Sequence, residues 1–572
     1  MRAKLAIAIV TLCTLVVTAA ADEDTVPPPP PARGTQLIKA TAVWRWQITT
    51  APTIPRGVGA MAATAGEVAA GRARAPSPVL GEPGPIPASW PYDVAGLAPV
   101  IPKPADGQRI AAAFGITSFQ ISDADARISM LELRLRYRDG VAAWINGVEV
   151  LRQGLPRGPT NTLALRQRGP EWETFYIAVA PGLLRRGANT LAVEVHPSGR
   201  RTAPSLLADL IGRSDRGILR GPALVETTQT TATIVVDTDP DVDATLEWGA
   251  GEALSTIQKS PPGRRHVFVL ANLSPDARFS YRVRAGSSQS AKYTFSTLPK
   301  AGAEIRIGIY GDVRGGHSIH RRLLERMLAE GLDFVVVSGD MVTRGSDEGD
   351  WQQFFGLTQD LRAQLPYYPA IGNHDLGMSN PDGTSRADKM FSLPPAPSGR
   401  PPDSYWYSRD VSDIHLVFLD SNNYDRGDQE TWLEADLAAA RKRGVRSIVV
   451  ITHDGPFARG YHGGNTLARA RYVPILARHK VDLVISGHDH IYQRGEHLGL
   501  RYLVSGGGGA PLYAIRCGVP GRPKCSIEDG MQHVAREYHY AVMTIGRDVE
   551  LCPRRPDGSL LEKCVRYPLG KP

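Results

Sequence analysis

The stretch IRIGIYGD (305–312) is an apolar, β-branched run that ends directly in a glycine and an aspartate. The same pattern recurs along the chain in FVVVSGD (334–340), YYPAIGNHD (367–375), SIVVITHD (447–454) and LVISGHDH (483–490). Short apolar runs of this kind predict buried strands, and the periodic segments between several of them predict helices. Residues 304–546 are therefore expected to form an α/β domain.

The polar residues of these five motifs all follow predicted strands directly. In open α/β sheets, ligands bind just beyond the carboxyl ends of the strands, so we expect these side chains to meet at one edge. Carboxylate, amide and imidazole groups without cysteine suit hard and borderline metal ions. The candidate residues are Asp312, Asp340, Asn373, His374, His453, His488 and His490.

These motifs, in this order, resemble those of the calcineurin-like metallophosphoesterases. GHDHIYQR (487–494) and YLVSGGGGAPLY (502–513) resemble the purple-acid-phosphatase-like branch, and the resemblance covers roughly residues 306–546. It implies a four-layer α/β sandwich that holds two metal ions, drawn from iron, zinc and manganese. The implied reaction is hydrolysis of a phosphate ester by a metal-bound hydroxide.

The resemblance also implies a role for each motif residue. Asp340 would bridge the two metals, with Asp312 and His490 on the first. Asn373, His453 and His488 would hold the second metal. His374 would donate a proton to the leaving oxygen, for which an imidazole is suited.

Arg344 lies in GDMVTRG (339–345), which resembles a stretch of the serine/threonine protein phosphatases. There its guanidinium would grip the phosphoryl oxygens. The alternative is a surface arginine beside a turn glycine.

The sequence departs from the family pattern at the first motif. The usual Asp-x-His is here Asp312-Val313-Arg314, so the first metal loses a ligand and gains a neighbouring cation. Either His317 substitutes as a ligand or Arg314 binds phosphate.

A second departure is Thr343, which stands where purple acid phosphatases carry their charge-transfer tyrosine and where the protein phosphatases carry the acidic partner of the catalytic histidine. No purple iron centre is expected, and His374 must be oriented by another group, for which Asp375 and Asp454 are candidates.

Two all-β regions precede the α/β domain, so the fold class is multidomain: two N-terminal β-sandwiches followed by the metallophosphoesterase sandwich. The run RYRDGVAAWINGVEVLR (136–152) carries an Asn-Gly hairpin signal and resembles galactose-binding-like jelly rolls. Carbohydrate binding is one interpretation of this module, and a purely structural sandwich is the other. NLSPDARFSYRVRA (272–285) resembles fibronectin type III domains, whose expected role is support of the site.

The start of the chain indicates export. Arg2 and Lys4 precede the apolar run LAIAIVTLCTLVVT (5–18), and small residues follow it, which is typical of a secretory signal. The apolar run is short for a membrane span, and no later run approaches its length. We therefore expect a periplasmic or secreted protein without a transmembrane segment in its mature form.

The cysteines agree with an oxidising compartment, because four remain after the signal is removed. We expect Cys517 to pair with Cys525 and Cys552 with Cys564. The net charge of +8 comes from lysines and arginines scattered among acidic residues, so no nucleic-acid partner is expected.

The predicted organisation is as follows: signal peptide 1–21, Pro-rich linker 22–33, galactose-binding-like sandwich 34–213, fibronectin type III-like domain 218–298, phosphoesterase domain 304–546 and disulfide-stapled tail 547–572. The predicted function is acid-phosphatase-like hydrolysis of a phosphate monoester. Two alternatives stay open: a phosphodiesterase or nucleotidase on the same site, and a catalytically weak protein that binds glycans or surfaces.

Overall fold

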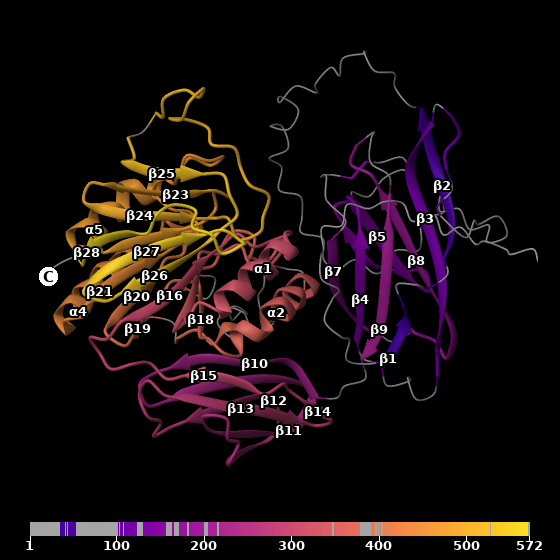
Figure 1. Cartoon of the computed structure of the whole chain (residues 1–572), viewed down its shortest axis with the longest axis horizontal. Helices are drawn as coiled ribbons and strands as arrows, with labels where there is room; N and C mark the ends of the chain where they lie inside the picture. Colours follow the sequence, from indigo (N-terminus) through magenta and orange to yellow (C-terminus); the bar gives the residue numbers. More distant parts are fainter. Residues whose placement is uncertain are drawn as a thin grey trace, which may run out of the picture.

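The computed structural model describes residues 35–39, 42, 44–52, 101, 103–106, 108–122, 128, 130–155, 163–164, 171–179, 182–199, 204–213, 217–345, 348–377, 390–394, 397, 400–401, 404–526 and 528–569. The predicted signal peptide and Pro-rich linker lie outside these ranges. The chain forms an N-terminal group of strands, a second group of strands and an α/β part (Figure 1).

The N-terminal strands form two facing antiparallel sheets, with strand orders β1-β9-β4-β7 and β2-β3-β8-β5-β6. Leu133 of one sheet and Val193 of the other lie in the same core. The predicted Asn146-Gly147 hairpin is confirmed, because Ile145 pairs with Val148 across it. The strands are β1 (Thr35–Ile38), β2 (Arg45–Pro52), β3 (Gln108–Ile121), β4 (Met130–Tyr137), β5 (Gly140–Ile145), β6 (Val148–Gln153), β7 (Glu171–Ala178), β8 (Gly187–His196) and β9 (Leu206–Arg213).

The second group of strands packs around Ile234, Leu246 and Phe268. Its order is β10-β11-β13-β14, with β12 paired to β11 and β15 paired to β13. Tyr281 of this group donates from its hydroxyl to the carbonyl of Ala363 at 2.6 Å, which ties the group to the α/β part. The strands are β10 (Gly217–Thr227), β11 (Ala232–Ala250), β12 (Thr256–Leu270), β13 (Arg278–Ala285), β14 (Ser288–Gln289) and β15 (Tyr293–Ser296).

The α/β part contains two sheets, ordered β18-β17-β16-β26-β27-β28 and β19-β20-β21-β22-β24-β23-β25. β16, β17 and β18 run parallel to one another, as do β20, β21, β22 and β24. The strands are β16 (Ile305–Tyr310), β17 (Phe334–Val337), β18 (Tyr367–Pro369), β19 (Tyr407–Val411), β20 (Ile414–Phe418), β21 (Ser447–Ile451), β22 (Leu483–Ser486), β23 (Tyr492–His497), β24 (Leu500–Ser505), β25 (Met531–Ala535), β26 (Tyr540–Ile545), β27 (Asp548–Arg554) and β28 (Val565–Pro568).

Alternating side chains on these strands produce four layers. Ile307 and Val336 pack against Val449 and Ile485 of the other sheet, whereas Val335 faces helices on its outer side. Helices α1 (His317–Leu328) and α2 (Glu348–Arg362) cover the first sheet, and α4 (Gly427–Arg443) and α5 (Val473–Arg478) cover the second. The described part of the chain also contains a 3-10 turn, η2 (Ser421–Asn423), and a π-helical turn, η3 (Ala468–Tyr472). The predicted fold class, β-sandwiches followed by a four-layer α/β sandwich, is confirmed.

Both predicted disulfides are present, Cys517–Cys525 and Cys552–Cys564. Among the described residues, none of the helices combines the length and apolar composition needed to cross a membrane.

Candidate functional site

The polar motifs lie in tight turns directly after their strands. Asp312 follows β16, Asp340 follows β17 and His488 follows β22, and their φ angles are 56°, 54° and 67°. Side chains other than glycine seldom adopt this left-handed backbone, and such strain concentrates at functional sites. The turns bring the carboxylates and imidazoles to one edge of the two sheets.

Asp375 holds two of these turns together. Its buried carboxylate accepts hydrogen bonds from the backbone amides of Asp340 (2.9 Å), Met341 (2.8 Å), Val342 (3.2 Å) and Gly372 (2.9 Å). Burial raises the pKa of Asp375, while the four amide donors favour its charged form. Asp375 therefore fixes the conformation of the backbone around Asp340.

His453 Nε2 is the point at which one group of donors converges. It lies 3.0 Å from Asn373 Oδ1, 3.1 Å from His488 Nδ1 and 3.3 Å from Asp340 Oδ1. Its Nδ1 lies 2.8 Å from the Ser338 carbonyl, to which it donates, and this leaves Nε2 with a lone pair facing the cluster. Ligand atoms bound to one ion at about 2.0–2.2 Å lie about 3 Å apart, which fits this spacing.

Burial, together with the nearby His453 and His462, lowers the pKa of His488 to about 2. For His453, burial lowers the pKa, but the Asp340 and Asp312 carboxylates outweigh burial and the net shift is upward. A neutral His488 and the oxygens of Asp340 and Asn373 beside His453 form a donor set that suits a cation.

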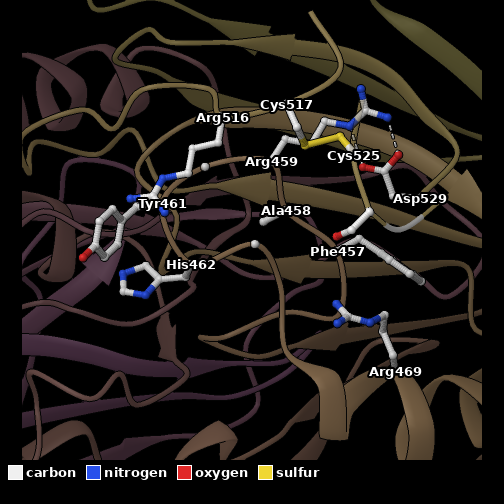
Figure 2. A pocket seen from close by; sticks show the side chains of 13 residues that line it. Phe457, Ala458, Arg459, Tyr461, His462, Arg469, Arg516, Cys517, Cys525 and Asp529 are labelled. Atoms are coloured by element: carbon white, nitrogen blue, oxygen red, sulfur yellow. Dashed lines mark hydrogen bonds and ion pairs between the residues drawn. A yellow bond between two sulfur atoms is a disulfide. The ribbon is translucent and has the colours of Figure 1, made fainter. Parts of the chain in front are cut away.

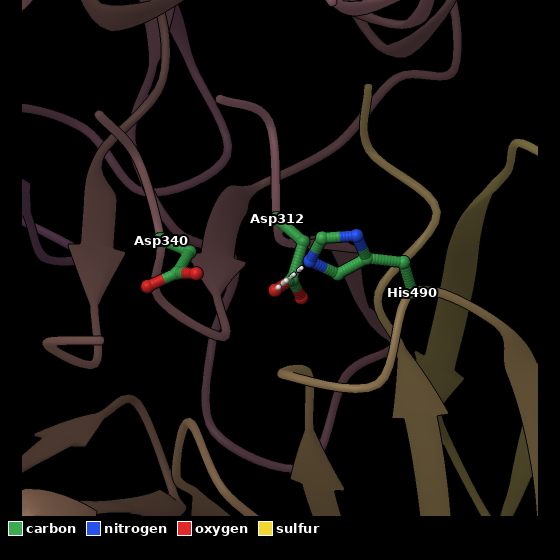
Figure 3. A group of neighbouring side chains, drawn as sticks. All are labelled: Asp312, Asp340 and His490. Carbon is green, nitrogen blue, oxygen red and sulfur yellow. Dashed lines mark ion pairs between the residues drawn. The ribbon is translucent and has the colours of Figure 1, made fainter. Parts of the chain in front are cut away.

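A second group consists of Asp312, Asp340 and His490, whose ligand atoms all lie within 4.8 Å of one another (Figure 3). His490 donates from Nδ1 to the carbonyl of Pro511 at 2.7 Å. Its Nε2 is buried, lies 3.4 Å from Asp312 Oδ1 and has no hydrogen-bond partner among the described residues. A buried ring nitrogen that faces two carboxylates fits a metal ligand.

Arg314 borders this second group. It is buried and donates from Nε to Asp340 Oδ2 at 3.0 Å. His317, the predicted substitute ligand, lies elsewhere: its Nε2 is 3.3 Å from Glu173 Oε1 of β7, and Tyr137 donates to the other oxygen of Glu173. The structure thus brings Arg314, but not His317, to the cluster.

His374 is oriented differently from the prediction. Its Nδ1 donates to the backbone carbonyl of Thr343 at 2.8 Å, and burial lowers its pKa. Asp375 is occupied by backbone amides, and Asp454 accepts from Asn465 at 2.7 Å. The prediction that one of these aspartates orients His374 is therefore wrong.

Arg344 lies at the rim. Its side chain is 54% exposed, and its Nε lies 3.7 Å from Asp350 Oδ2. Its backbone amide donates to the same carboxylate at 3.0 Å. The structure does not bring the Arg344 guanidinium into either group of donors.

The glycines after β24 pack against the Asp312 turn. A Cβ on Gly508 would lie 2.2 Å from the carbonyl oxygen of Gly311, and one on Gly506 would lie 2.2 Å from that of Asp489. Gly508 donates to the same Gly311 carbonyl at 2.9 Å. The absence of a side chain at Gly506 and Gly508 allows this close backbone approach.

Sequence reasoning missed Tyr513, an aromatic side chain that lies behind one of the site histidines. Tyr513 stacks on His490 with ring centroids 4.0 Å apart, and His462 lies over His488 at 3.8 Å. Tyr513 closes the quoted YLVSGGGGAPLY motif, so its position in that motif was the available signal.

A cavity of about 210 Å³ opens beside His462 (Figure 2). Residues 457–463 form one side of it, and the segment with the Cys517–Cys525 disulfide forms another. The cavity therefore adjoins the cluster through the His462–His488 contact.

Residues 305–492 match the family model for calcineurin-like phosphoesterase. Purple acid phosphatase 21 of Arabidopsis thaliana is 26% identical over 276 residues, which cover 46% of this chain and 62% of the relative. Purple acid phosphatase 1 of Ipomoea batatas is 25% identical over 251 residues, or 41% of this chain and 52% of that protein. The match thus spans less than two thirds of these relatives' length.

Among solved structures, purple acid phosphatase PPD1 from yellow lupin (Lupinus luteus) seeds has a similar fold. The TM-score is 0.54 at 16% sequence identity, and the match covers 79% of this chain and 92% of that one.

Proposed function

We propose, from the calcineurin-like phosphoesterase domain that residues 305–492 form, that this protein is a metal-dependent hydrolase of phosphate esters. The observation that carries the proposal is the convergence of Asn373, His453 and His488 on one side of Asp340, with Asp312 and His490 on the other. Neither group needs a residue from outside the chain.

The donors of both groups are oxygen and imidazole nitrogen, which suits iron, zinc or manganese. When bound, such ions lower the pKa of a coordinated water and neutralise charge on the phosphoryl oxygens. The chain fixes the donors in advance: His453 and His490 each donate Nδ1–H to a backbone carbonyl, so both present Nε2 to the cluster.

We assign the remaining roles to residues around the donors. His374, held through Nδ1 by the Thr343 carbonyl, protonates the leaving oxygen from Nε2. Arg314 uses the guanidinium N–H groups that do not contact Asp340 to bind phosphoryl oxygen. Arg344 contributes from the rim if it turns away from Asp350.

One observation favours the alternative of a catalytically weak binding protein. The Arg314 guanidinium already contacts the carboxylate that the two groups share, and this weakens the affinity for cations on that side. The N-terminal sandwich would then be the functional module, with carbohydrate as its ligand. A phosphodiesterase would use the same donors with a wider approach to the cluster.

We place the active protein outside the cytoplasm, as a periplasmic or secreted enzyme. The two disulfides support this location, because such bonds persist in oxidising compartments. The second group of strands is proposed to act as a fibronectin type III-like support, through contacts such as Tyr281 with Ala363.

The proposal is tested by removing metal with a chelator and assaying phenyl phosphate and bis-phenyl phosphate before and after reconstitution with zinc, manganese or iron. We expect activity only after reconstitution, with the monoester preferred. Equal activity of the stripped and reconstituted protein would refute metal dependence. A preference for the diester would move the phosphodiesterase alternative ahead. Metal binding without turnover of either ester would favour the binding protein.

A further inference from the structure

We infer that the cavity beside His462 is a leaving-group subsite, and that it selects phosphate esters whose leaving group carries its own negative charge. This inference rests on the proposed function and specifies its substrate class. The subsite consists of Tyr461, His462, Arg469 and Arg516, which line the cavity together with the backbone around them (Figure 2).

The position of the subsite follows from His462. Its ring lies 3.8 Å from that of His488, and His488 contacts His453 at the candidate metal position. Asp489 fixes the segment by accepting from the backbone amides of His462 (2.8 Å) and Gly463 (3.1 Å). A group attached to a phosphorus atom at the cluster therefore has the cavity as its neighbour.

The charge of the lining is positive. Three arginines line the cavity, and Asp529 is the aspartate among the lining residues. Arg459 pairs with Asp529 through two hydrogen bonds of 2.7 and 2.5 Å, so these two charges cancel. Arg469 donates to the carbonyl of Pro456, which is neutral. The net positive charge of the cavity lining therefore comes from Arg469 and Arg516.

Arg516 is the more exposed of the two remaining cations. Its guanidinium lies over the Tyr461 ring, 4.1 Å from the centroid, and no carboxylate lies within ion-pair distance among the described residues. Stacking on the ring leaves the N–H edges of the guanidinium available to a carboxylate or phosphate. Arg516 is therefore the residue that would recognise the second charge.

The frame around Arg516 is rigid. Its backbone amide donates to the carbonyl of Arg459 at 2.8 Å, and the next residue is Cys517, which is bonded to Cys525. Arg469 lies on the π-helical turn η3, a type of irregularity often found at functional sites. A preformed frame of this kind lowers the entropic cost of binding.

The reaction itself needs no further reactant. Water forms the new bond to phosphorus, the phosphorus–oxygen bond to the leaving group breaks, and the leaving oxygen gains a proton. The charge held by Arg516 belongs to the leaving group and is unchanged by the reaction. Its contribution is therefore to binding of the substrate.

The test compares phenyl phosphate with 4-carboxyphenyl phosphate, which differ by one carboxylate at the far end of the leaving group. We expect a KM for the carboxylated ester about fivefold lower in the unmodified protein, as for a partly exposed ion pair. Arg516→Gln should remove that preference, so that the variant has the same KM for the two esters. Arg522→Gln, an exposed arginine of the same disulfide segment outside the cavity lining, is the control and should keep the preference.

Binding is measured separately with 4-(phosphonomethyl)benzoate and benzylphosphonate, which cannot be hydrolysed, by isothermal titration calorimetry. The protein could prefer the carboxylated compound in an Arg516-dependent way and yet hydrolyse neither ester. That result would support the subsite and refute the hydrolase proposal. Turnover of both esters with equal KM, or a preference that survives Arg516→Gln, would overturn the subsite and leave the hydrolase proposal intact.

Discussion

Arg314 donates from Nε to Asp340 Oδ2 across 3.0 Å, while Asp340 Oδ1 faces His453 Nε2 at 3.3 Å. The two oxygens of one carboxylate thus face different partners. Burial raises the pKa of Asp340, but His453, His374 and Arg314 outweigh burial, and the net shift is downward to about 2. Asp340 is therefore ionised and shared.

This sharing predicts unequal affinity for metal at the two positions. In the part of the chain that the structure describes, no guanidinium contacts Asn373, His453 or His488. A metal held by Asp312 and His490 would instead compete with Arg314 for Asp340. We expect the protein to retain about one zinc or manganese equivalent per chain after gel filtration, measured by elemental analysis.

Two variants of Arg314 separate charge from ligation. Arg314→His supplies an imidazole and should raise retention to about two equivalents, whereas Arg314→Gln removes the charge alone and should give an intermediate value. Two tightly held equivalents in the unmodified protein would show that the guanidinium does not weaken the position at His490.

Asn373 gives a cleaner test of ligation than His453. Asn373 is exposed, so Asn373→Ala should cut kcat/KM by at least about a hundredfold and shift the Tm little. His453 is buried and donates to Ser338, so His453→Ala should lose activity and also lower the Tm. Activity assays with parallel thermal unfolding check both. Near-normal turnover of reconstituted Asn373→Ala would contradict its role as a ligand.

The buried strands of the five motifs, and the edge at which their polar residues meet, were predictable from the sequence. Apolar runs such as Phe334–Val337 are buried on both faces, and parallel strands place their ends together. What the sequence could not show were contacts made by backbone atoms. His374 is oriented by the carbonyl of Thr343, which every residue carries, so no side-chain pattern marks it.

The position of His317 depends on a distant part of the chain. Its partner Glu173 lies on β7, in a sheet of the N-terminal sandwich, which packs against α1 and α2 (Figure 1). Its spacing in the sequence suggested that His317 lies near Arg314. The contact of His317 with Glu173 is instead determined by the packing of the N-terminal sandwich on the α/β part. Residue types within a motif therefore limited the candidates without deciding between them.

His415 predicts a pH-dependent contribution to stability away from the site. It lies between Asp410 Oδ1 (2.6 Å from Nδ1) and Asp436 Oδ2 (2.8 Å from Nε2). Burial lowers its pKa, but the two aspartates outweigh burial and the net shift is upward. The contribution is therefore complete below the unfolded pKa of about 6.5 and is lost as pH rises through the higher folded pKa.

We expect His415→Gln to reduce the free energy of unfolding more at about pH 5.5 than at about pH 9, as measured by urea denaturation. Asp436→Asn should remove part of the same pH dependence, because it deletes one of the two carboxylates. Equal destabilisation by His415→Gln at both pH values would show that His415 contributes by packing alone.

Gly508 offers a steric test of the site's backbone. A Cβ added at Gly508 would lie 2.2 Å from the carbonyl oxygen of Gly311, next to Asp312. This oxygen is a backbone atom, so it cannot move aside as the end of a flexible side chain could. Gly508→Ala should displace the Asp312 turn, cost about 1–3 kcal/mol of stability and lower kcat/KM and metal retention together. Gly427→Ala, at a glycine with nothing within 4 Å of the added Cβ, is the matched control and should change neither. A Gly508→Ala protein with unchanged metal retention would show that the turn tolerates the shift, and that the glycines serve the packing of the sheets rather than the position of Asp312.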